Sequence, residues 1–502
     1  MILATGIIFL DSTVVNVALP TIDRELDAGL SGLQWIVDGY VLTLASLLIL
    51  GGSLGDRYGR RRVMIIGLVG FGLSSAACGL APSISWLIGA RMLQGLTGAL
   101  LVPGSLAILR ATFPEGEARG QAIGQWSGWS GITTVLGPLL GGWLVEALSW
   151  RWIFLINLPI VAVAVIFLLS RVPESRSAEA PQRLDWIGAA LITIGLGGLA
   201  YGLIEGPVIG WAAPAVIVAL GGGLVALLLF VLQERRAREP MVPLELFKSR
   251  NFSGANLTTL SVYFALYGTT FFLVIYLQNV LGYSALLAGL VLAPISLLML
   301  LLSPVFGRLA GRHGPRLFMS AGPFACGLGL LLFTRAGPES GFWTGLLPAI
   351  FVFGLGLATT VAPLTDTVVS AAPEEHSGVA AAFNNSVSRV AALLAVASLG
   401  VVVTVTFRGA LQQRTADLSL GPDVQATLQE AAQDPTGAVD RAQLPQEARD
   451  AVDAAYTEAF QQAMLTSSAA AFLGAVIAWL SIRRVPAAER HGAPDESATG
   501  QS

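Results

Sequence analysis

Long apolar stretches, separated by short polar loops, recur along nearly the whole chain. A helix needs about 20 apolar residues to cross the hydrocarbon core of a bilayer, because each residue advances the helix by about 1.5 Å. Helices suit such stretches, since a lone strand leaves its backbone groups unpaired in lipid. On this scale we expect about fourteen membrane-spanning helices, at residues 1–22, 34–54, 63–81, 86–108, 120–145, 152–170, 186–205, 212–232, 253–277, 285–305, 317–335, 342–362, 378–406 and 460–482.

The composition favours the same class of protein. Hydrophobic residues make up 54% of the 502 residues and charged residues 12%, whereas about a quarter of a typical soluble domain is charged. The sequence therefore predicts an all-α membrane protein with no separate soluble domain, and the net charge of -3 does not suggest a nucleic-acid partner. Cys78 and Cys326 lie in apolar stretches and the three histidines are not spaced as metal ligands, so we expect no metal site.

The basic residues indicate the side on which each loop lies, because arginine and lysine concentrate in cytoplasmic loops. They gather in the loops after the second, fourth, sixth, eighth and tenth predicted helices and in the C-terminal tail. The opposite short loops hold only Arg24, Arg151 and Arg335. This asymmetry predicts that both termini lie in the cytoplasm and that the number of spans is even.

Residues 407–460 form a longer polar segment, which this orientation puts outside the cell. Two stretches of it, near 423–432 and 446–462, have the pattern of amphipathic helices. The segment is either a solvated cap or, alternatively, a vestibule or a binding surface for a partner.

A short internal repeat indicates two related halves. The segment Gly52–Met64 aligns without gaps on Gly307–Met319, with six of thirteen positions identical. If the helices at 186–205 and 212–232 are an insertion, each copy follows the second helix of a six-helix unit. Parallel repeats of this kind build many secondary transporters, with the substrate site between the halves. The expected organisation is an N-terminal six-helix bundle at 1–170, two additional helices with linkers at 171–250, a C-terminal six-helix bundle at 251–482 that includes 407–460, and a cytoplasmic tail at 483–502.

The first copy of the repeat has the residues of a conformational gate. Glycine permits a tight turn between two helices. Asp56, at the cytoplasmic end of the second helix, is expected to pair with an arginine on a neighbouring loop, and such a pair can lock one conformation. The alternative is an anchor of basic residues on the cytoplasmic side. The expected gate comprises Gly52, Gly55, Asp56, Arg57, Gly59, Arg60 and Arg61.

Five segments carry a resemblance to one family. The segment from Gly52 to Arg61 resembles the signature loop of the major facilitator superfamily. Arg91-Met-Leu-Gln94-Gly95 resembles its RxxQG segment, and the stretch from Gly131 to Gly142 resembles its antiporter motif. Leu10–Pro20 and Trp150–Pro159 are similar to segments of the fourteen-helix drug:proton antiporter branch, the EmrB/QacA-like proteins. The second loop departs from the pattern, because Gly311 stands where the family has an acid.

The resemblance implies a major facilitator fold of two six-helix bundles plus two inserted helices. It implies a proton-coupled antiporter that exports small hydrophobic or cationic compounds, such as drugs and antibiotics, across the bacterial plasma membrane by alternating access. Such a protein uses no cofactor and is driven by the proton gradient. Its partners are a small-molecule substrate, protons and the lipid bilayer, and an envelope partner stays an open alternative.

Ionisable residues inside the predicted spans are functional candidates, because burying a charge in the membrane is costly. Asp11 lies midway along the first span, and Arg91 lies at a similar depth in the fourth, so a contact between them is geometrically allowed. We expect them to form a proton-coupling pair, with a static ion pair as the alternative. Asp38 is either a second proton or cation site or a residue at the membrane interface. Arg389 has no evident partner, which leaves a backbone carbonyl, an anionic substrate or an acid from the other half.

Two further groups of residues are expected to shape the transport path. A helix seam in the fifth span combines glycines that allow close packing with a proline that allows a kink, either to restrict a leak path or simply to pack helices. Its residues are Gly131, Gly137, Pro138, Gly141 and Gly142. An aromatic cavity would suit bulky apolar or cationic compounds, although such residues also form packing layers or lipid-facing belts. Its candidates are Tyr40, Gln125, Trp129, Tyr267, Phe271 and Arg389.

Two other functions stay open on the sequence alone. One keeps the fold but makes the protein a symporter or an importer of a metabolite. The other is a membrane enzyme or a receptor. The chain contains no HExxH, no GxxxxGK[ST] loop and no paired catalytic Ser/His arrangement, which argues against an enzyme and against an ATP-driven pump.

Overall fold

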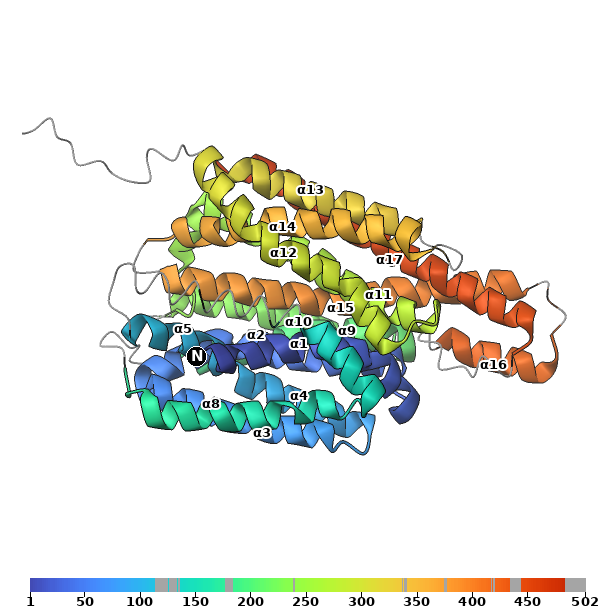
Figure 1. Cartoon of the computed structure of the whole chain (residues 1–502), viewed down its shortest axis with the longest axis horizontal. Helices are drawn as coiled ribbons and strands as arrows, with labels where there is room; N and C mark the ends of the chain where they lie inside the picture. Colours follow the sequence, from blue (N-terminus) through green and yellow to red (C-terminus); the bar gives the residue numbers. More distant parts are fainter. Residues whose placement is uncertain are drawn as a thin grey trace, which may run out of the picture.

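The structure is a computed structural model. It describes the chain except for residues 113–124, 126–132, 134–135, 177–183, 238–239, 336, 338–340, 374–376, 417, 419, 434–443 and 484–502. Every regular element in the described part is a helix, which confirms the all-α class (Figure 1).

The described helices follow one another in two groups with a pair between them. The first group contains α1 Ile2–Leu26, α2 Gly29–Tyr58, α3 Arg60–Gly79, α4 Ile84–Gly98, α5 Leu101–Thr112, α7 Trp152–Leu155 and α8 Asn157–Arg171. Residues 136–147 are also helical and belong to this group. The pair is α9 Trp186–Ile209 and α10 Pro214–Arg236. The second group contains the 3₁₀ turn η1 Leu244–Lys248, α11 Arg250–Asn279, α12 Ala285–His313, α13 Pro315–Phe333, the π turn η2 Phe342–Leu346, α14 Leu347–Ser370, α15 Ser377–Thr415, α16 Pro422–Gln433 and α17 Gln446–Ser481.

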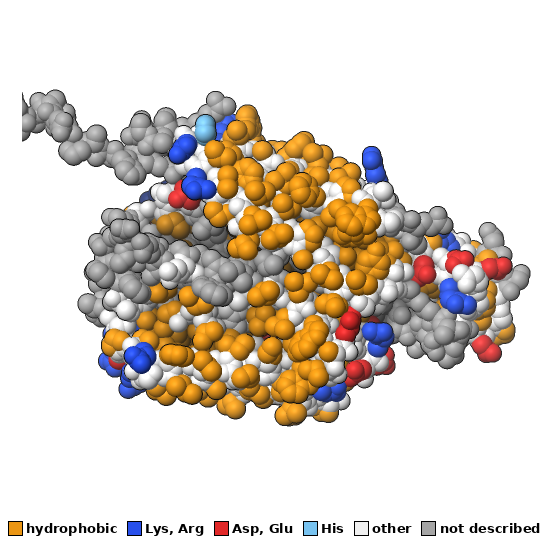
Figure 2. Space-filling view, viewed as in Figure 1, with side chains coloured by type: hydrophobic (Ala, Val, Ile, Leu, Met, Phe, Trp, Pro, Cys, Tyr) orange, Lys and Arg blue, Asp and Glu red, His pale blue; other side chains and the backbone are white. Residues whose placement is uncertain are grey.

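Within the described residues, 13 helices are long and apolar enough to cross a membrane. They coincide with thirteen of the expected spans. The other expected span, 120–145, lies mostly outside the described residues, although its last part is helical from 136 onwards. Large apolar side chains such as Leu73, Val218 and Leu480 are exposed on the flanks, and Figure 2 shows such side chains covering a broad band with charged residues gathered at the two ends. Lipid is the solvent that suits this surface.

The internal repeat is visible in the helix boundaries. Gly59 separates α2 from α3 and Gly314 separates α12 from α13, with φ values of 113° and 86°. A left-handed backbone of this kind favours glycine. The two glycines occupy the same position in the aligned segments, so the repeated sequence encodes the same break between two antiparallel helices.

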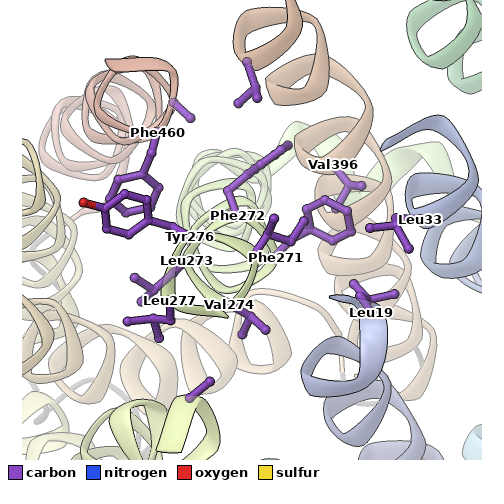
Figure 3. Close-up of a cluster of buried hydrophobic side chains, with 14 of the residues drawn as sticks. Leu19, Leu33, Phe271, Phe272, Leu273, Val274, Tyr276, Leu277, Val396 and Phe460 are labelled. Carbon is purple, nitrogen blue, oxygen red and sulfur yellow. The ribbon is translucent and has the colours of Figure 1, made fainter. Parts of the chain in front are cut away.

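The two groups form lobes that meet along α1 and α2 on one side and α11, α12 and α15 on the other. The pair α9 and α10 lies beside this junction, with α9 against both α2 and α15 and α10 packed on α9. Figure 3 shows the apolar contact between the lobes, where Leu19 and Leu33 approach Phe271 and Val396. These residues lie near the α1–α2 turn, and we call this end of the molecule the α1–α2 end. The opposite end, with the α2–α3 turn, is the α2–α3 end.

The segment 407–460 is more helical than the hydropathy pattern indicates. Both expected amphipathic helices are present, as α16 and as the first part of α17. The helices α15 and α17 have 39 and 36 residues, which at 1.5 Å per residue gives roughly 58 Å and 54 Å, well beyond the ~30 Å hydrocarbon core. The spans expected at 378–406 and 460–482 lie within these helices, whose polar parts continue beyond the apolar stretches. Their projecting ends are linked by an ion pair between Arg414 and Glu458 at 3.1 Å, and Figure 1 shows them extending past the bundle.

Candidate functional site

A buried ion pair lies at the centre of the first lobe. Asp11 of α1 and Arg91 of α4 are each 1% exposed, and the Arg91 Nη1 to Asp11 Oδ2 distance is 2.6 Å. The contact expected from the sequence is therefore present. In a low-dielectric interior, removing one partner of such a pair leaves the other charge uncompensated, which costs several kcal/mol.

Two neutral side chains complete the coordination of the Asp11 carboxylate, and a third supports them. Gln94 donates to Asp11 Oδ1 at 3.0 Å and accepts from Arg91 at 2.8 Å. Asn157 of α8 reaches the same oxygen at 3.4 Å. Both amides also donate to the hydroxyl of Ser75 in α3, at 3.2 Å and 3.0 Å. The carboxylate is thus held by donors from α4 and α8, whose amides are in turn tied to Ser75 of α3, and this fixes its orientation.

The guanidinium of Arg91 is fixed independently of Asp11. Its Nε donates to the carbonyl of Ile36 in α2 at 3.1 Å, and its charge lies 4.2 Å from the centre of the Tyr40 ring. A cation over an aromatic face is favourable when both are desolvated. Arg91 therefore has contacts that do not depend on its bond to Asp11.

Sequence reasoning assigned Asp11 and Arg91 to this site but missed the other members. Gln94 and Asn157 occur in the segments that carried the family resemblance, so a signal for them existed. Ser75 lies in an apolar stretch without a motif, and nothing in the sequence indicated it.

Asp38 of α2 is a second buried carboxyl group. It is fully buried within the protein. Neither of its oxygens has a hydrogen-bond partner within the part of the chain that the structure describes. One turn earlier on α2, Gln34 donates to the carbonyl of Val396 in α15, and Trp35 donates to Glu205 of α9 at 2.8 Å. Asp38 thus lies on the helix that joins the first lobe to α15 and α9.

The signature loop makes its contacts inside the first lobe. The Arg60 guanidinium lies 2.7 Å from Asp56, so among the described residues the acid pairs one turn onward in the same loop; the neighbouring loop at 113–124, where a partner was expected, lies outside them. The backbone N–H groups of Arg61 and Arg62 donate to the Glu174 carboxylate at 3.0 Å and 3.1 Å. An acid at the N-terminus of α3 is favourable because the helix dipole is positive there. Sequence reasoning missed Glu174, which follows α8 and ties this end of α8 to the loop.

The helix seam packs against both lobes. Added Cβ atoms at Gly137 and Gly141 would meet Thr13 and Val14 of α1. A Cβ at Gly142 would lie 2.6 Å from the Cα of Leu286 in α12. On the facing side, Gly289 of α12 approaches the carbonyl of Pro138, and the Leu286 N–H donates to Glu146 at 2.8 Å. The seam residues therefore join the lobes near the α1–α2 end; the expected member Gly131 lies outside the described residues.

A small cavity lies between the lobes, directly beside the buried ion pair. Arg91 and Tyr40 line it from the first lobe, and Tyr267, Phe271 and Arg389 line it from the second. Its free volume is about 20 Å³, enough for a water molecule and far less than the hundreds of Å³ that a drug-sized ligand occupies. The lobes must separate before such a molecule can enter.

Two other candidates for the cavity are not placed in it. Gln125 is exposed and does not line it. Trp129 lies outside the described residues. No group of three or more His, Cys, Asp or Glu residues with the geometry of a metal site is found in the described part of the chain.

Comparison with known proteins agrees with this architecture. The chain is 39% identical over 415 residues to the multidrug resistance protein Stp of Mycobacterium tuberculosis (strain CDC 1551 / Oshkosh), which covers 82% of this chain and 77% of that protein. It is 37% identical over 431 residues to the tetracenomycin C resistance and export protein of Streptomyces glaucescens, covering 84% and 79%. A solved structure of a bacterial homologue of the human lysosomal transporter Spinster shares the fold, with a TM-score of 0.67 at 18% identity over 98% of this chain and 97% of that one.

The apolar helices and these relatives identify a multi-pass protein of the bacterial plasma membrane. The sequence matches the Major Facilitator Superfamily over residues 1–396. The chain belongs to the Major Facilitator Superfamily.

Proposed function

We propose that the protein exports small hydrophobic molecules, drugs and antibiotics among them, in exchange for protons. The names of its relatives, a multidrug resistance protein and an antibiotic resistance and export protein, support export. The observation that carries proton coupling is the Asp11–Arg91 pair, a buried carboxylate whose cationic partner lines the cavity between the lobes. The substrate crosses unchanged, without a cofactor.

A proton reaching Asp11 would break its ion pair with Arg91, because a neutral carboxyl group no longer attracts the guanidinium. Arg91 is then held by Ile36 and Tyr40 of α2, so protonation loosens α1 from α4 and leaves α4 attached to α2. The seam packs directly on α1 at Thr13 and Val14. A shift of α1 would therefore disturb the contact that closes the α1–α2 end, and this links the proton to the direction of access.

Asp38 is the proposed second proton site. An ionised carboxylate without a partner is costly to bury, so Asp38 has no stabilised charged state in this conformation. Its helix α2 contacts α9 through Trp35 and α15 of the second lobe through Gln34. Separation of the lobes would change the surroundings of Asp38, and the group could then gain or lose a proton. Each proton that crosses with the membrane potential supplies about 2.3 kcal/mol per 100 mV.

The test uses inverted vesicles that carry an acidic interior, with a panel of dyes and antibiotics added outside. Export corresponds to uptake into these vesicles, so an exported substrate should collapse the pH gradient in the native protein. Asp11→Asn should abolish this collapse, whereas Asp423→Asn, the same change on the exposed face of α16, should leave it intact. Acidification of the lumen upon substrate uptake would instead identify a symporter, and collapse that persists in Asp11→Asn would remove Asp11 from the coupling pathway.

A further inference from the structure

Arg389 of α15 is a buried cation without a carboxylate partner. Its side chain is 8% exposed. Among the described residues its only side-chain hydrogen bond goes to the hydroxyl of Tyr267, at 3.4 Å, and its charge lies 6.0 Å from the centre of the Phe9 ring. The backbone carbonyl that the sequence left open as a partner is not involved in the described part of the chain.

Among the described residues, no acid near the cavity neutralises this charge. Of the residues that line the cavity, only Arg91 and Arg389 are charged, and Arg91 is already paired with Asp11. The groups that interact electrostatically with Arg389 are Tyr40, Tyr263 and Tyr267, whose hydroxyls are neutral. The segment 118–145, part of which the structure does not describe, contains no Asp or Glu at all. Counting the residues that the structure describes, the cavity wall therefore carries one positive charge without a counter-charge.

A buried guanidinium without a counter-charge is unfavourable, and an anionic group placed beside it removes that penalty. Arginine presents a planar fork of N–H donors that matches the geometry of a carboxylate or sulfonate. The remaining large side chains around it, Tyr40, Tyr267, Phe271 and Phe9, offer aromatic faces and edges. A cationic substrate could contact these aromatic faces, but the positive charge of Arg389 would repel it.

We propose that this cavity, once widened, binds an aromatic anion whose acidic group pairs with Arg389. The inference rests on the proposed export function and specifies its substrate class. It replaces the expected hydrophobic or cationic compounds with planar aromatic compounds that carry a carboxylate, sulfonate or phenolate. Tyr267 holds Arg389 toward the cavity and is a positioning residue.

Two xanthene dyes of similar size and opposite charge test the proposal. At pH 7.5 fluorescein is an anion and rhodamine 123 is a cation. Purified full-length protein in detergent should bind fluorescein more tightly than rhodamine 123, as measured by fluorescence anisotropy, and proteoliposomes with a pH gradient should transport fluorescein. Arg389→Gln should weaken fluorescein binding about tenfold or more, the size expected for losing a hydrogen bond between charged groups, without weakening rhodamine binding. Arg389→Lys should recover part of the loss, and Arg312→Gln on the exposed end of α12 should change neither dye.

Three results would overturn the proposal: tighter binding of rhodamine 123 than of fluorescein, no binding of fluorescein, or an equal loss of both dyes in Arg389→Gln. The last result would show that Arg389 supports the structure of the cavity and does not pair with the anion. The proposed proton antiport would be refuted by a different result, which comes from the transport measurement. Fluorescein binding that depends on Arg389, combined with transport that ignores the pH gradient, would refute proton coupling and leave the substrate class standing.

Discussion

Gly142→Ala should shift the protein toward the conformation that is open at the α1–α2 end. The new Cβ would lie 2.6 Å from the Leu286 Cα, whereas ordinary contact begins at 3.4 Å, so the helices must move apart by roughly 0.8 Å. The atoms met belong to backbone, which cannot rotate away. Overpacking of this kind costs about 1–3 kcal/mol in the closed state. If the open state relieves that cost, the ratio of open to closed protein rises about 5- to 150-fold.

The shift can be measured as a distance between spin labels on the two lobes by double electron–electron resonance. Arg24 of α1 and Trp343 of η2 are exposed at the α1–α2 end of their lobes and can be replaced by cysteine. The native Cys78 and Cys326 are fully buried, so labelling them is disfavoured. The long-distance population should increase in Gly142→Ala.

Matched variants separate the seam from a general effect of alanine. Gly221→Ala in α10 has no atom within 4 Å of the new Cβ, so its distance distribution should equal that of the native protein. Gly289→Ala, on the facing side of the seam, should reproduce the shift because its Cβ meets the Pro138 carbonyl. A folded Gly142→Ala protein with the native distribution would refute the view that the seam holds the lobes together.

Two other predictions concern residues outside the ion pair. Asp38→Asn should leave the melting temperature of the purified protein unchanged, because the Asp38 carboxylate has no described hydrogen bond to lose. The same variant should reduce transport driven by a pH gradient, and native transport would exclude Asp38 as a proton site. Glu174→Gln should lower the free energy of unfolding by about 0.3–1 kcal/mol, because it removes a charge from the N-terminus of α3. Thermal unfolding measures this loss, with Glu245→Gln in the exposed η1 turn as the control. Equal stability of the two variants would contradict the role of Glu174 at the N-terminus of α3.

The sequence was sufficient to predict the features that depend only on position along a helix axis. Apolar length gives the number and depth of helices, and depth alone placed Asp11 and Arg91 at the same level, where the structure brings them into contact. The repeat predicted a shared break, which occurs at Gly59 and Gly314. Hydropathy gave the spans within α15 and α17 but not the ends of these helices, because it reports the membrane boundary and not the end of a helix.

Features that depend on rotation about the helix axis could not be predicted. Whether Ser75 faces lipid or the Asp11 carboxylate is decided by how α3 packs on its neighbours, and an apolar stretch without a motif gives no such information. The partner of Asp56 depended on the turn at Gly59, which returns Arg60 to the acid one turn away. The charge preference of the cavity could be inferred only from the structure, in which Arg91 is paired with Asp11 whereas Arg389 has no carboxylate partner among the described residues.

The central claim is that Asp11 couples proton movement to substrate movement, and flux in proteoliposomes tests it most directly. The lumen is loaded with a pH-sensitive dye, and a compound that collapses the gradient in the vesicle assay is added outside without any imposed pH difference. The account predicts that substrate entry alkalinises the lumen of native proteoliposomes, and that Asp11→Asn still exchanges labelled substrate across the membrane but no longer moves protons. Substrate-driven proton flux at the native rate in Asp11→Asn would contradict the claim.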